Sequence, residues 1–168
     1  MSFDNSNILL QLLHLPEKIV SMSSVNNIVD LVLYHLASKE CFAFKKSAYI
    51  LNNPEFGCAK GVCGYDSQDE IFDSCYWQSP KESIEKLKEN KFNQKIKSWK
   101  YNDKCLKDEE EIKKMALSEL GFENPYVITW NNKYDNQGIL IFEPISLDFL
   151  DKHQNVLNKI GSLIGMIH

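Results

Sequence analysis

The chain has 168 residues, of which 43% are apolar, and its 19 basic residues, all lysine, stand against 23 acidic ones for a formal net charge of −4. This length suits one compact domain over residues 1–168 that buries a core of its own. A negative net charge opposes binding to the phosphate backbone, so we expect no nucleic-acid partner.

The N-terminal residues lack the basic, apolar and small-residue regions of a secretion signal, and no apolar stretch approaches the roughly 20 residues that span a bilayer. We therefore expect a cytoplasmic protein with no membrane partner. The five cysteines are an odd number, which favours reduced thiols over a disulfide framework.

The N-terminal region, residues 6–40, has the apolar spacing of helices. Residues 6–22 predict an amphipathic helix that Pro16 breaks, or that restarts as a second short helix after Leu15. We expect the next helix to begin near Ser24 as its cap and to continue beyond Leu36.

A sheet and a pocket are expected over residues 43–143. In the first strand, alternation predicts that Phe44, Ala48 and Ile50 share one face. A loop over 52–57 and a partner strand over 59–65 complete a hairpin, and residues 126–130 and 138–142 predict a second hairpin that ends at Pro144.

Between the hairpins, the pattern predicts helical segments over 70–77, 80–90 and 108–120, with a short strand over 95–101. Acidic residues at 108–111 suit the first turn of a helix, and Gly121 suits its end. After the second hairpin, Ser146 is the expected cap of a closing helix over 146–168.

This order of elements resembles the GAF domain family, with a PAS-like fold as the second possibility. The resemblance lies in residues 44–51 as the first strand, in the late strand Gly138-Ile139-Leu140-Ile141-Phe142, and in the helix opened by residues 146–150. It implies an α+β fold in which an antiparallel sheet carries helices on one face and a variable helical segment over the other. It also implies small-molecule sensing, dimerisation through terminal helices, or both.

Aromatic side chains on the expected strands suit the walls of a small-molecule pocket. We predict that the pocket is lined by Tyr49, Cys63, Tyr65, Trp77 and Trp130. No motif predicts a catalytic residue, a metal site or a particular cofactor. We therefore expect a sensory or regulatory module with no reaction of its own, acting as a homodimer and relaying a signal to a downstream domain or protein.

Two alternatives stay open. The segment Gly61-Val62-Cys63-Gly64 resembles the surroundings of a cysteine in the free methionine-R-sulfoxide reductases, which implies a Cys63 nucleophile with Cys75 or Cys105 as resolving thiol. The second alternative is a module that only binds other proteins and has no ligand. Cys58 and Cys63 lie five positions apart in the strand, an odd separation that predicts opposite faces and no shared metal ion.

Overall fold

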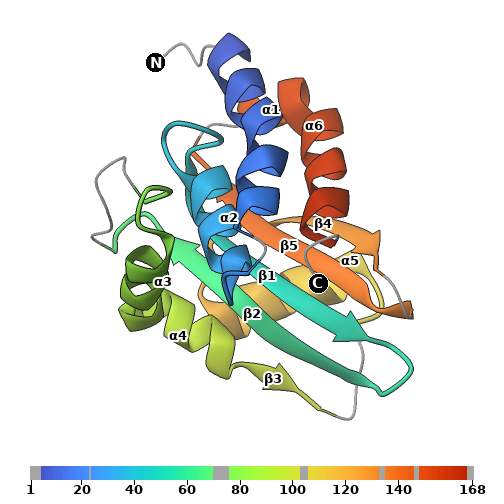
Figure 1. The fold of residues 1–168 in the computed structure, drawn as a ribbon. Coiled ribbons are helices and arrows are strands. Elements are labelled where there is room, and N and C mark those ends of the chain that lie inside the picture. The colour runs from blue at the N-terminus through green and yellow to red at the C-terminus, as the bar shows by residue number, and fades with distance from the viewer. Residues whose placement is uncertain are drawn as a thin grey trace.

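The computed structural model describes residues 5–22, 24–69, 76–102, 106–132, 135–145 and 148–165, and within them the chain forms an α+β fold (Figure 1). A five-stranded antiparallel sheet has the order β3-β2-β1-β5-β4. The strands are β1 (Phe44–Asn53), β2 (Cys58–Asp66), β3 (Lys100–Tyr101), β4 (Tyr126–Asn131) and β5 (Gln137–Pro144). The helices are α1 (Asn5–Ser21), α2 (Ile28–Ala37), α3 (Pro80–Glu89), α4 (Lys91–Ser98), α5 (Glu109–Met115) with its π-helical continuation η1 (Ala116–Leu120), and α6 (Asp148–Gly165).

Helices cover both faces of the sheet. Figure 1 shows α1, α2 and α6 together across one face, where they bury the larger of two apolar clusters. The second cluster lies on the opposite face under α4, α5 and η1. The predicted fold class, with helices on one face and a helical middle segment over the other, is confirmed. None of the described helices combines the length and the apolar character needed to cross a membrane.

The first hairpin forms as predicted, but a bulge places the side chain of its first residue on the opposite face of the sheet. Phe44 pairs with Pro144 and Lys46 with Glu143, so Lys45 is an extra residue in β1. As a result Phe44 packs in the larger cluster, whereas Ala48 and Ile50 belong to the cluster on the other face. The prediction that these three residues share a face is wrong, because strict alternation does not survive a bulge.

The expected strand over 95–101 is reduced to the two residues of β3, and its first part belongs to α4. Phe92 and Ile96, one helical turn apart, lie over two glycines of β2. A Cβ atom on Gly61 would stand 1.9 Å from the Ile96 carbonyl oxygen, and one on Gly64 would stand 2.5 Å from Ile96 Cγ1. Only glycine permits this approach, which holds the segment as a helix against the sheet.

Two expectations for the N-terminal helices are corrected. Helix α1 continues through Pro16, because Leu15 is fully buried and Ile19 packs against the same core one turn later. The lost backbone hydrogen bond is outweighed by these contacts. Helix α2 begins at Ile28 and not near Ser24, since Asn27 takes a left-handed conformation with φ of 62° directly before it.

Most other element predictions are confirmed. Helix α3 and the helix after Asp108 lie where expected, the Asp108 carboxylate accepts a hydrogen bond from the Glu111 amide at 2.8 Å, and Gly121 ends η1 with φ of 81°. The β4–β5 hairpin also forms. The predicted helix over 70–77 falls mostly outside the described residues, with 76–77 in a turn, and Ser146 lies outside them.

The two helical layers meet beside β2, at the part of its outer edge that β3 does not reach. Strand β3 pairs only with Ala59 and Lys60. Further along, the Gly64 amide donates to Asn93 Oδ1 at 2.9 Å, so a side chain of α4 takes the place of a neighbouring strand. Asn93 Nδ2 donates in turn to Asp30 of α2 at 2.9 Å, and Lys97 Nζ lies 2.5 Å from the same carboxylate. Since Asp30 is buried, its charge depends on these partners.

Replacing Asp30 with alanine should lower the free energy of unfolding by about 3 kcal/mol, because Lys97 loses its counter-ion inside a largely buried network. Chemical denaturation followed by circular dichroism measures this change. Glu82→Gln, which alters the exposed pair with Lys86, is the matched control and should shift stability by less than about 0.5 kcal/mol. Equal effects of the two substitutions would contradict this assignment.

Candidate functional site

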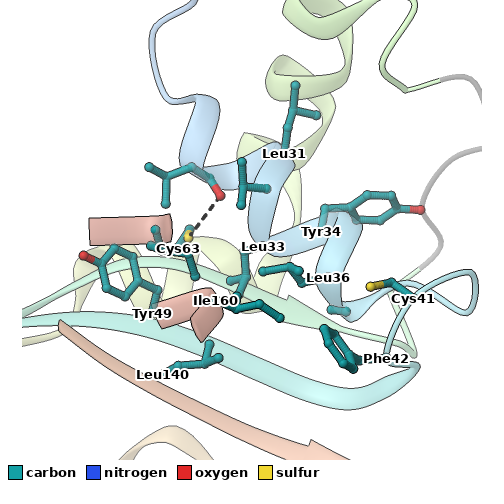
Figure 2. Close-up of a cluster of buried hydrophobic side chains, with 14 of the residues drawn as sticks. Leu31, Leu33, Tyr34, Leu36, Cys41, Phe42, Tyr49, Cys63, Leu140 and Ile160 are labelled. Carbon is teal, nitrogen blue, oxygen red and sulfur yellow. Dashed lines mark hydrogen bonds between the residues drawn. The ribbon is translucent and has the colours of Figure 1, made fainter. Parts of the chain in front are cut away.

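Three of the five predicted pocket residues lie together under α2 and α6. Tyr49 and Cys63 are direct cross-strand partners on β1 and β2. The Trp130 ring stacks on Tyr49 with ring centroids 5.6 Å apart and an interplanar angle of 15°. Figure 2 shows Tyr49 and Cys63 beside Ile160 of α6 and beneath the leucines of α2.

The space around Trp130 is filled by the chain itself. Its indole lies against three glycines, where a Cβ atom would stand 2.2 Å from the ring at Gly138, 2.5 Å at Gly161 and 2.9 Å at Gly165. Tyr49 is fully buried beneath it. This group is therefore a packed contact between the β4–β5 hairpin and α6.

The other two predicted residues, Tyr65 and Trp77, belong to a second group at the α2 end of the same face. The Tyr34 ring meets Tyr65 edge to face at 5.7 Å and Tyr76 at 4.8 Å. His35 meets Trp77 at 5.7 Å. We call Tyr34, His35, Tyr65, Tyr76 and Trp77 the histidine–aromatic cluster.

His35 is the polar centre of this cluster. Its Nδ1 atom lies 2.7 Å from the Tyr76 hydroxyl and accepts from Trp77 Nε1 at 3.3 Å. Because Nδ1 is an acceptor, the imidazole proton lies on Nε2. Nε2 is buried, and although no hydrogen bond of full geometry to a described residue is formed there, the backbone carbonyl of Gln11 serves the imidazole as an acceptor.

The pKa of His35 is lowered to about 4, mainly by burial and also by the nearby charge of Lys18, while the backbone carbonyl of Gln11 partly opposes both. The Lys18 Nζ atom also lies 5.4 Å from the centre of the Trp77 ring. The imidazole is consequently neutral near pH 7. Its hydrogen-bond partners are an indole and a phenol, and no described carboxylate orients it, so the arrangement suits binding better than acid–base catalysis.

Cys63 has the surroundings of a structural thiol. It is 1% exposed, and its Sγ atom lies 3.9 Å from the Val29 carbonyl oxygen, the contact that Figure 2 marks. Burial raises the pKa of the thiol well above its usual value, and Asp30 adds to the increase. A neutral, inaccessible thiol is a poor nucleophile. Cys75 and Cys105, proposed as its resolving partners, lie outside the described residues.

The prediction that Cys58 and Cys63 face opposite sides of the sheet is wrong. Tyr49 pairs with Cys63 and Asn53 with Cys58, and the bulge at Val62 brings both cysteines to one face. Their partners still lie four positions apart along β1, a distance of about 13 Å. Within the described part of the chain, no three histidine, cysteine or acidic side chains are grouped to hold a metal ion.

Comparison with known proteins adds no family assignment: no protein-family model, no curated protein and no solved structure matches this chain.

The pKa of His35 predicts a pH dependence of stability. The unfolded chain binds a proton near the ordinary pKa of 6.5 and the folded chain only near 4, so stability falls as pH decreases between these values. The loss attributable to His35 should be of the order of 3 kcal/mol. Urea unfolding at pH 7, 6, 5 and 4 should show a flatter profile for His35→Phe than for the native chain. His14→Gln, at an exposed histidine, should leave the profile unchanged, and the same profile in all three proteins would refute the prediction.

Proposed function

We propose that this chain is a non-catalytic regulatory module of the GAF-like kind, which relays a signal by self-association through its terminal helices. The sheet flanked by a layer of N- and C-terminal helices supports this proposal. So does the inert setting of Cys63, the residue on which the reductase alternative depends.

The observation that carries the proposal is an apolar stripe on the outer face of α1. Ile8 and Leu15 point into the core, whereas Leu9 is 53% exposed, Leu13 70% and Val20 72%. Leu9, Leu13 and Val20 lie four and seven residues apart, which places them along one side of the helix. Leu10, also 53% exposed, widens the stripe at one end.

A second copy of the same helix is the partner that fits this stripe. The spacing of Leu9, Leu13 and Val20 matches the seam of paired helices, in which apolar residues recur every three or four positions. The stripe itself has no charged side chain, so two copies can meet without repulsion. His14 and Glu17 lie beside it, 3.6 Å from each other and exposed, as expected for the polar border of such a contact.

Leu13→Glu tests the dimer, because it places a charge in the centre of the stripe without altering the core. In sedimentation experiments, the variant should lose association through α1 at concentrations where the native chain retains it. Phe56→Glu is the matched control, since Phe56 is 76% exposed in the β1–β2 loop, away from the helices. It should associate like the native chain.

A native chain that is monomeric at high concentration would refute self-association. Reduction of free methionine sulfoxide with a thioredoxin-type reductant, lost in Cys63→Ser, would instead establish the reductase alternative.

Small-molecule binding is the second candidate function, and the neutral imidazole of His35 among the rings of the histidine–aromatic cluster favours it. A planar ligand with a carbonyl or carboxylate oxygen suits a neutral imidazole among aromatic rings. Native mass spectrometry of the purified protein should show a bound small molecule that His35→Phe loses and His14→Gln keeps. Ligand-free spectra for all three would contradict this candidate.

A further inference from the structure

Strand β4 forms an edge of the sheet that no other strand covers within the described part of the chain. It is the last strand in the order, and its six residues pair with β5 from Tyr126 to Asn131 without a register shift. The sequence of β4 contains no charged residue and no proline. Natural sheets usually protect an edge with lysine, proline, a bulge or a very short strand. The opposite edge of this sheet has the last of these protections, because β3 has only two residues.

The hairpin geometry shows which residues of β4 present their backbone groups outward. The Asn132 amide donates to the Asn136 carbonyl at 2.7 Å, so Asn132 points its backbone toward the β5 side. Backbone groups alternate along a strand, which directs Val127, Thr129 and Asn131 to the free edge. No other described strand pairs with that edge, and the side chains of Thr129 and Asn131 are exposed.

We infer that β4 pairs with β4 of a second copy, antiparallel about a two-fold axis at Thr129. In this register Thr129 lies opposite its own copy and Val127 opposite Asn131. All three outward residues of each strand then exchange hydrogen bonds, about six in total. The edge is self-complementary and uncharged, so it suits a second copy in the isologous manner of a two-fold interface.

This inference goes beyond the α1 contact, because the two surfaces belong to different parts of the fold. The α1 stripe faces outward from the helical layer, whereas the β4 edge lies at the side of the sheet, beyond α6 (Figure 1). A chain with two such isologous surfaces assembles beyond the dimer. Each contact can therefore be disrupted by its own substitution, and the size of the assembly that remains shows which of the two contacts exists.

Thr129→Pro is the most direct test, because proline removes an outward amide that makes no hydrogen bond within the sheet. Thr129→Val, which keeps the amide, is its matched control. In sedimentation experiments we expect the native chain and Thr129→Val to form assemblies larger than dimers. Thr129→Pro should give dimers, Leu13→Glu should give dimers through β4, and the double variant should give monomers.

Thr129→Lys provides a second variant that leaves the backbone unchanged and places two lysines against each other at the two-fold axis. It should behave like Thr129→Pro. Hydrogen exchange adds a local readout: in Leu13→Glu, the amides of Val127, Thr129 and Asn131 should become protected as concentration rises.

Two results would overturn the inference: folded Thr129→Pro and Thr129→Lys that assemble like the native chain, or a Leu13→Glu variant that is monomeric. If the Leu13→Glu variant formed assemblies of native size while the Thr129 variants formed smaller ones, the α1 contact would be refuted and the β4 pairing would stand.

Discussion

The junction of Asp30, Asn93 and Lys97 is the contact on which the two-layered arrangement depends. Helices α2 and α4 lie on opposite faces of the sheet, and they can meet only where the sheet ends. Strand β3 stops after two residues, and this leaves the second half of β2 open for them. Asn93 satisfies the Gly64 amide there, while Asp30 and Lys97 compensate each other's charge. A longer β3 would exclude this contact.

The sequence predicts the two hairpins, the fold class and most helices, because alternation, turn residues and helical spacing are local properties. It fails where a non-local contact decides. The bulge at Lys45 moves the side chain of Phe44 to the other face of the sheet. The bulge at Val62 brings Cys58 and Cys63 to the same face. The segment leading to Trp99 is helical because Ile96 rests on Gly61, an approach that no local pattern reveals.

The candidate site shows the same division. Tyr49, Cys63 and Trp130 could be placed near one another from their strands, since strand pairing determines which side chains meet. His35 could not be singled out, because a lone histidine on an apolar helix carries no signal of its own. Its importance comes from Tyr76 and Trp77, more than 40 residues later in the chain, which supply its hydrogen bonds.

The glycines around Trp130 have a mechanical consequence. The indole lies against Gly161 and Gly165 on α6 and against Gly138 on β5, and it also stacks on Tyr49. The indole fills the space between the closing helix and the last hairpin. A shift of α6 along the sheet would therefore bring its backbone into collision with the ring. The closing helix and the edge strand β4 thus share one packed contact, so a change of position in either one requires this contact to repack.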